Sequence, residues 1–114
     1  MLVNLRSPAR ADSNRDSLGH LELLVLLAAL RLGGNVLSKS IAGAIAEAGF
    51  PAHISAVYTS ISRLEKKGMI QVTVGAKTSV LGGRARRYLT VSGHGERTAR
   101  RVLKVIRALA ENSL

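Results

Sequence analysis

Five side chains that can form hydrogen bonds or carry positive charge recur within a short stretch in the middle of the chain. They are Ser55, Thr59, Ser62, Arg63 and Lys66. Among them, Val57, Ile61 and Leu64 follow an i, i+4, i+7 spacing, which predicts a helix with these apolar residues buried and the polar set on the opposite face. Hydroxyls reach base edges or phosphates, and an arginine can bond guanine O6 and N7 together. The pattern therefore indicates nucleic-acid recognition.

Two residues of this predicted helix, which spans about 55–67, have two interpretations each. Tyr58 lies at the edge between the faces, so its ring can pack while its hydroxyl reaches a phosphate, or the hydroxyl can bond inside the domain. Ser55 can cap the helix, contact a phosphate, or do both, because a helix N-terminus itself attracts phosphate. Gly68 ends the helix after Lys66 and Lys67, whose charges suit the helix dipole.

The positive charge of the chain is concentrated in its C-terminal half. Seventeen Lys and Arg against 7 Asp and Glu give a net charge of +10 and a pI near 11.4. Residues 63–107 hold twelve basic and two acidic residues and so carry the whole excess. Such a surface concentrates polyanions, which makes nucleic acid the leading partner and an acidic membrane the second. The most apolar run, 23–30, is too short to cross a bilayer. We expect no membrane partner, because the apolar face of the last predicted helix is needed for folding or dimerisation.

The 114 residues of the chain suit one compact domain. The spacing of the apolar residues divides the chain into three parts. Residues 1–16 predict a flexible N-terminal arm, with a docked strand over 2–5 as the alternative. Residues 17–92 predict a DNA-binding domain, and 93–114 predict a C-terminal dimerisation helix. The expected elements are helices over about 17–32, 38–48 and 55–67, strands over about 69–74 and 86–91, and a last helix over about 94–111.

The order of these elements is typical of a winged helix-turn-helix, a mainly α fold with a small β-hairpin. The helix over 55–67 is then the recognition helix, which enters a major groove about 12 Å wide. The hairpin provides a wing over about 75–86 that lies on the DNA backbone or in the minor groove. Its candidate DNA-binding cations are Lys77, Arg84 and Arg86.

Helix caps and core positions follow from the same pattern. We expect Ser38 or Ser40 to cap the second helix, and Ser92 or Thr90 to cap the last one. In the second strand, Leu89 and Val91 alternate toward the core.

The last predicted helix has an apolar stripe that serves one of two purposes. It covers the core of its own domain, or it packs on a second chain. We favour a homodimer, because a two-fold operator requires two recognition helices about 34 Å apart. The candidate interface residues are Ala99, Val102, Leu103, Ile106 and Leu109.

Two segments carry a resemblance to a known family. Residues 56–70, with the sequence AVYTSISRLEKKGMI, and residues 82–91, with GGRARRYLTV, resemble the recognition helix and wing of the PadR family of winged-helix transcriptional regulators. The leucine-rich stretch 18–32 is also similar to theirs. The resemblance covers about 17–110 and fits the short branch of the family, which has a single C-terminal helix.

The resemblance implies a homodimeric repressor whose last helix crosses that of its partner. A site for a small-molecule effector at the dimer interface is also implied. By position, Tyr58 is the helix tyrosine near DNA, and Glu65 and Gly68 are the helix-ending pair. Arg84 and Arg86 are the wing cations.

Several classes of site are not expected. The chain has no cysteine, so it has no disulfide or thiolate site, and we expect a cytoplasmic location. His20, His53 and His94 lack metal-ligand spacing, so we expect no metal and no cofactor. No GxSxG motif singles out a nucleophile, so we do not expect an enzyme.

Two alternatives to a DNA-binding regulator stay open. One is a basic RNA-binding or ribosome-associated protein, although Phe50, Tyr58 and Tyr88 are the only aromatic residues for stacking on single strands. The other is a winged helix that binds an acidic protein. Competition between DNA and RNA duplexes of one sequence distinguishes the RNA-binding alternative from a DNA-binding regulator. A pull-down that survives nuclease treatment supports the protein-binding alternative.

Overall fold

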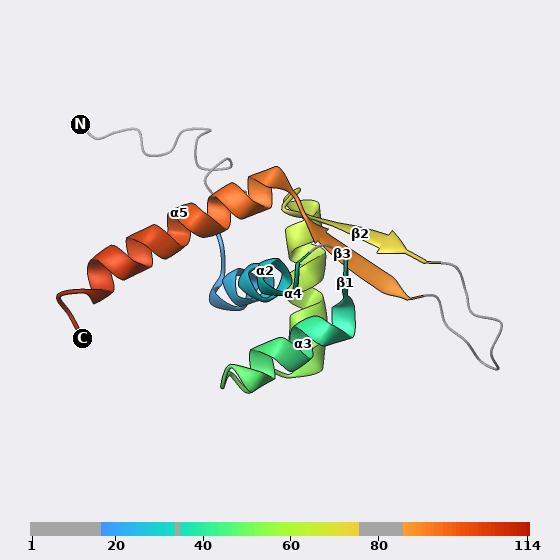
Figure 1. The fold of residues 1–114 in the computed structure, drawn as a ribbon, viewed down its shortest axis with the longest axis horizontal. Coiled ribbons are helices and arrows are strands. Elements are labelled where there is room, and N and C mark those ends of the chain that lie inside the picture. The colour runs from blue at the N-terminus through green and yellow to red at the C-terminus, as the bar shows by residue number, and fades with distance from the viewer. Residues whose placement is uncertain (1–16, 34, 76–85) are drawn as a thin grey trace.

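The computed structural model describes residues 17–33, 35–75 and 86–114 (Figure 1). Its elements are α2 (His20–Leu32), β1 (Val36–Leu37), α3 (Ser38–Glu47), α4 (Ile54–Lys66), β2 (Ile70–Val74), β3 (Arg87–Val91) and α5 (Gly93–Ala110). The mainly α fold with a small sheet and a long last helix confirms the predicted fold class. The predicted arm over 1–16, its alternative strand over 2–5, Lys77 and Arg84 lie outside the described residues.

The sheet has one strand more than the sequence predicts. Its order is β1-β3-β2, with both neighbours antiparallel to β3. The hairpin register pairs Ile70 with Val91. Leu89 is buried and Val91 packs against the core, as predicted. Val36 of β1 pairs with Leu89, on the other side of β3. Two residues are too few to show an alternating pattern, so the sequence gives no signal for β1.

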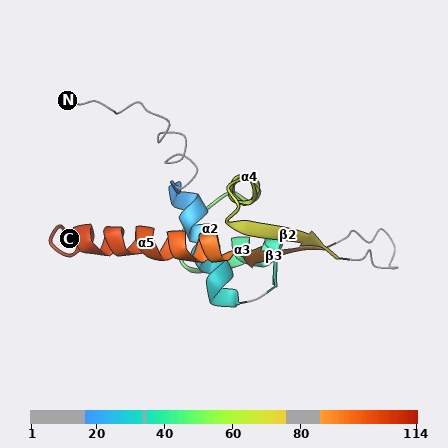
Figure 2. The same cartoon turned by 90° about the horizontal axis from the view of Figure 1, so that it is seen from above.

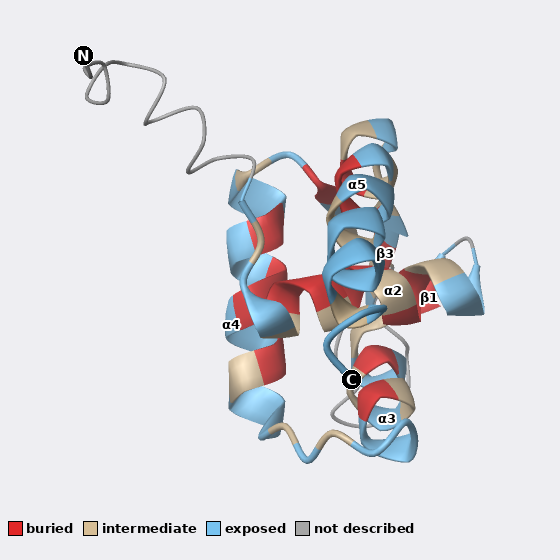
Figure 3. Ribbon diagram, turned by 90° about the vertical axis from the view of Figure 1, so that its left-hand side faces the viewer, coloured by how far each residue is buried: buried red, intermediate tan, exposed pale blue. Residues whose placement is uncertain are grey.

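The core lies where α2 meets α3, α4, α5 and the sheet. Leu26 of α2, Ile41 of α3, Leu64 of α4 and Leu89 of β3 are fully buried against one another. Burying each such side chain stabilises the fold by about 1.5–3 kcal/mol. Figure 3 shows α4 on one side of the molecule and α5 on the other, with α2 crossing between them. Helices α4 and α5 are thus both fixed on α2.

Two predicted N-caps are wrong. Helix α4 begins at Ile54, so its N-cap is His53, whose ring accepts a bond from the Ser55 backbone N–H at 3.4 Å. Ser55 therefore lies inside the first turn, and its N–H is one of the unpaired helix-terminal donors that the His53 ring satisfies. Helix α3 is capped by Leu37 and not by Ser38 or Ser40, because the pairing of β1 with β3 holds Leu37 in an extended conformation directly before the helix.

The C-terminal end of α4 closes as predicted, at Gly68. This residue has φ +75°, a left-handed conformation that glycine adopts at no steric cost. The Met69 N–H bonds the Leu64 carbonyl at 2.9 Å, and the Gly68 N–H bonds that of Glu65 at 3.0 Å. Met69 and Leu64 are both fully buried. Together these contacts form a Schellman motif, which fixes where the chain leaves the helix.

Helix α5 starts on that same end of α4. Its N-cap is Ser92, as predicted, and the Ser92 hydroxyl accepts from the Gly95 N–H at 3.0 Å and donates to the Gly68 carbonyl at 2.7 Å. A Cβ on Gly95 would collide with the Met69 carbonyl, so only glycine fits there. From this junction α5 projects away from the domain, in the direction opposite to the β2–β3 hairpin (Figures 1 and 2).

Candidate nucleic-acid interface

The structure brings the predicted recognition residues together on the outer face of α4. Val57, Ile61 and Leu64 are buried, as the spacing predicts, and Ser60 is buried beside them. The opposite face is solvent-exposed and contains Ser55, Tyr58, Thr59, Ser62, Arg63 and Lys66, with the exposed acid Glu65 at its edge. The helix therefore presents a polar face with two cations, Arg63 and Lys66, on an apolar base.

The hydroxyl groups in the first half of this face are already hydrogen-bonded within the helix. The Ser55 hydroxyl lies 3.0 Å from Nδ1 of His53, and the Thr59 hydroxyl donates to the Ser55 carbonyl at 3.0 Å. Each oxygen keeps a lone pair that accepts a bond from a base amino group. To donate to a phosphate, Thr59 has to give up its bond to Ser55.

The Tyr58 side chain is exposed and does not lie in the core. Its exposed fraction is 43%. Of its two interpretations, the exposure favours a hydroxyl directed at an outside partner over one that bonds inside the domain. The contact itself stays a prediction.

The two lysines at the end of α4 have different surroundings. Lys66 is exposed on the outer face, whereas Lys67 turns inward and is 20% exposed. Its Nζ lies 2.7 Å from Oε1 of Glu22 and 2.8 Å from the carbonyl of Ser17. The same Glu22 oxygen accepts from the Gly19 N–H at 2.9 Å. Lys67 thus connects the end of α4 to the start of α2.

Sequence reasoning did not identify this positioning role of Lys67. The available signal was Glu22, the one acidic residue in the apolar helix α2. A carboxylate buried to 7% exposure needs a partner of opposite charge. The sequence shows that need but does not say which of the seventeen cations meets it.

The wing places its described cations at one end of the hairpin. Arg86 and Arg87 are exposed at the start of β3, and the Gly75 N–H bonds the Arg86 carbonyl at 2.8 Å across the hairpin. The Arg87 carbonyl accepts from the Ser38 hydroxyl at 3.4 Å, which links the wing to the start of α3. Of the predicted wing cations, the structure therefore places Arg86 and leaves Lys77 and Arg84 outside the described residues.

The apolar stripe of α5 divides into two parts. Ala99 is fully buried and Val102 packs against the core, while Leu103 is half-buried. Beyond them, Ile106 and Leu109 are 45% and 69% exposed. The first part of the stripe covers its own domain, and the last part is uncovered in the single chain.

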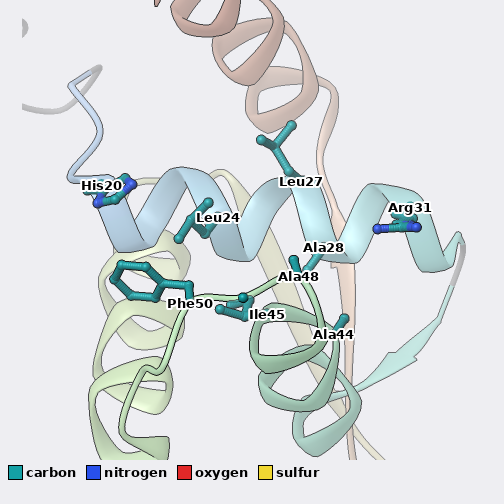
Figure 4. Close-up of a pocket in the computed structure, with 10 residues that line it drawn as sticks. His20, Leu24, Leu27, Ala28, Arg31, Ala44, Ile45, Ala48 and Phe50 are labelled. Atoms are coloured by element: carbon teal, nitrogen blue, oxygen red, sulfur yellow. The ribbon is translucent and has the colours of Figure 1, made fainter.

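A groove of about 430 Å³ runs between α2 and the end of α3 (Figure 4). Its floor is apolar, formed by residues such as Leu24, Ala28 and Ile45. His20 lies at one end, with its ring 5.2 Å from that of Phe50 in an edge-to-face contact. Arg31 lies at the other end. The sequence did not predict this groove, because it joins residues from two separate helices.

Within the described part of the chain, no group of three or more His, Asp or Glu side chains is close enough to hold a metal ion. No described helix has the length and apolar character needed to cross a bilayer.

Comparison with known proteins gives a structural likeness and no sequence match. No protein-family model and no curated protein matches the chain. A PadR family transcription regulator from Clostridium difficile is 18% identical and superposes with a TM-score of 0.70 over 82% of this chain and 93% of that one. A PadR-like transcription factor from Bacteroides fragilis is also 18% identical, with a TM-score of 0.69 and coverage of 94% and 96%.

A third similar structure is BpsR from Bordetella bronchiseptica, whose DNA binding is regulated by 6-hydroxynicotinic acid. It is 17% identical, with a TM-score of 0.62 over 90% of this chain and 77% of that one. At these identities the likeness concerns the fold. The chain has the winged-helix fold of PadR-like regulators, as the resemblance of its recognition helix and wing implied.

Proposed function

We propose that the protein is a sequence-specific DNA-binding transcriptional regulator that places α4 in the major groove. The observation that carries the proposal is the outer face of α4, where Arg63 and Lys66 stand exposed beside three hydroxyl groups and Tyr58. Arginine reads guanine and the hydroxyls bond bases or phosphates. The described wing residue Arg86, with Lys77 and Arg84, then contacts the backbone or the minor groove.

The proposed regulator acts as a homodimer. The support is the uncovered end of α5, where Ile106 and Leu109 need an apolar partner. A second copy of the same helix supplies one and makes a two-fold interface. Ala99, Val102 and Leu103 then continue that interface toward the domain. Two recognition helices in one dimer match the two halves of a symmetric operator.

We also propose that the dimer represses transcription and responds to a small molecule at its interface. Repression is what the resemblance to PadR regulators implies. BpsR, which has a similar fold, is regulated by a small aromatic acid. In this chain the uncovered apolar end of α5 offers the surface for such a site. A thermal-shift screen of small aromatic acids tests this part, and the absence of any stabilising compound contradicts it.

Selection of bound sequences from random duplex DNA tests the main proposal. We expect an enriched consensus with two-fold symmetry, because each protomer contributes one α4. An RNA duplex of the same sequence should compete poorly, since its deep, narrow major groove does not admit a helix. An unenriched DNA pool, or preferential competition by the RNA duplex, contradicts the proposal.

A further inference from the structure

Five exposed cations line one side of α5, and the proposed function does not use them. They are Arg97, Arg100, Arg101, Lys104 and Arg107. Their spacing follows helical turns, so they lie on one face, opposite the stripe that contains Ala99 and Ile106. Between Arg97 and Ala110 the helix contains no acidic residue. We call this set the α5 cationic face.

The α5 cationic face is separate from the DNA interface on α4 and the wing. Figure 1 shows α5 and the β2–β3 hairpin leaving the domain in opposite directions. In Figure 2, which views the molecule from above, α5 runs along a different side of the domain from α4. The distal cations therefore lie at the opposite end of the molecule from the wing.

The charge pattern is unfavourable for the free helix. Arg97 and Arg101, and likewise Arg100 and Lys104, lie four residues apart, where like charges repel. At the beginning of the face, Glu96 binds Arg100 at 2.8 Å and offsets part of this charge. The five cations are concentrated over a length of about 15 Å. A polyanion laid along the face removes the repulsion and gains a contact at each helical turn.

Dimerisation leaves this face open. The apolar stripe, which the proposed dimer buries, lies on the other side of the helix. Lys104 and Arg107, which are exposed in the single chain, then lie outside the proposed dimer interface.

The residue types favour a phosphate backbone over a protein or a single strand. Four of the five cations are arginines, whose planar guanidinium groups bind phosphate oxygens with two hydrogen bonds. Protein interfaces depend on apolar and aromatic anchors, and this face contains none. Single strands require aromatic stacking, and α5 contains no Phe, Trp or Tyr.

From these observations we infer that the α5 cationic face is a second DNA-binding surface, which holds the backbone of another duplex segment without reading its sequence. The inference goes beyond the proposed function, which assigns DNA to α4 and the wing alone. A dimer bound to its operator then carries two such faces and links the operator to a second stretch of DNA.

A capture experiment with two matched variants tests the inference. The selected operator duplex is immobilised and saturated with protein, and a labelled random-sequence DNA duplex is then added. The first variant, Lys104→Gln with Arg107→Gln, removes two charges from α5. The second, Arg63→Gln with Lys66→Gln, removes the same charge from α4. All four positions are exposed, so both variants should fold like the wild type, which circular dichroism checks.

We expect operator-bound wild type to capture the labelled duplex. The α5 variant should bind the operator within twofold of wild type but capture at least about tenfold less duplex at 100 mM salt, because each lost phosphate contact reduces the salt slope by about one. No capture by wild type, or equal capture by the α5 variant, overturns the inference. Stronger capture of labelled duplex RNA or of an acidic polypeptide also overturns it, in favour of that partner.

Direct titration separates this inference from the proposed function. Labelled random-sequence duplex is titrated with the α4 variant, which keeps the α5 cationic face intact. We expect residual salt-dependent binding that disappears when Lys104→Gln and Arg107→Gln are added. If wild type binds no operator but this residual binding is present, the proposed function fails and the inference stands. If the residual binding is absent while the operator is bound, the inference fails alone.

Discussion

Helices α4 and α5 are both amphipathic but have different surroundings. Each carries cations on one side and an apolar stripe on the other. The stripe of α4 is buried along its whole length by the domain, from Val57 to Leu64. The stripe of α5 is buried at Ala99 and exposed at Leu109. The difference shows that an amphipathic helix acts as a fixed platform only where its own domain covers the apolar side.

A second difference concerns how the two helices are held. The end of α4 is fixed by Lys67, which contacts both Glu22 and the Ser17 carbonyl, and by the Ser92 hydroxyl on Gly68. Helix α5 is held at its first turns and extends freely beyond them (Figure 1). We therefore expect substitutions on α4 to change stability or DNA reading, and those at the end of α5 to change assembly.

The largest effect is expected from charges placed in the uncovered stripe. Ile106→Glu with Leu109→Glu should convert the dimer to a monomer and weaken operator binding by about 10²–10⁴-fold, because the advantage of two linked binding modules is lost. Sedimentation and fluorescence anisotropy measure the two changes. Leu114→Glu is the matched control, since that side chain is fully exposed beyond the helix. A variant that remains dimeric places the interface elsewhere.

Shortening a buried side chain in the apolar stripe of α4 should lower the stability of the fold. Leu64→Ala in α4 removes a fully buried side chain and should lower the free energy of unfolding by about 2–5 kcal/mol. Leu109→Ala serves as the comparison, and its effect should depend on protein concentration because it acts through the dimer. Urea denaturation at two protein concentrations measures both. A concentration-independent loss of similar size in both variants contradicts the distinction between the two stripes.

Base reading by α4 is tested at Arg63. If this residue bonds a guanine, Arg63→Ala should weaken operator binding by about 1–3 kcal/mol and relax specificity at one base position in each half-site. Titration of single-base operator variants measures the effect. Ser62→Ala, at the neighbouring exposed position, should cost less because it removes one uncharged group. Unchanged affinity in Arg63→Ala removes this residue from the interface.

The smallest effects are expected from substitutions of the adjacent Lys66 and Lys67, which should act on different properties. Lys67→Met leaves Glu22 buried without its charged partner and should lower the free energy of unfolding by about 1–3 kcal/mol, with the salt slope of DNA binding unchanged. Lys66→Met should keep the stability and reduce that slope by about one. Thermal melts and salt titrations of both variants give the comparison. An unchanged slope in Lys66→Met means that Lys66 contacts no phosphate.

The sequence predicts the parts of this fold that depend on local periodicity. Val57, Ile61 and Leu64 indicated α4 and its buried side, Gly68 indicated its end, and Ser92 indicated the start of α5. The exposure of the predicted DNA-binding residues on α4 could be inferred from its buried side, because the opposite face of a helix packed on one side is left to solvent.

The features that depend on contacts distant in sequence could not be predicted in this way. Strand β1 exists because β3 offers it a free edge, and the resulting geometry moves the cap of α3 to Leu37. The role of Lys67 depends on Glu22, 45 residues away. The boundary between the covered and uncovered parts of the α5 stripe depends on where α2 ends its contact, which spacing along α5 does not reveal.

The most direct test of the central claim, that α4 and the wing form a DNA interface, is a salt titration of operator binding. Fluorescence anisotropy with the selected duplex should show affinity falling by about 10³–10⁵-fold between 50 and 200 mM salt, because six to ten phosphate contacts release counterions. The loss should be smaller for Arg63→Gln with Lys66→Gln, which removes up to two of these contacts per protomer. Absence of binding, or binding that does not change with salt, contradicts the claim.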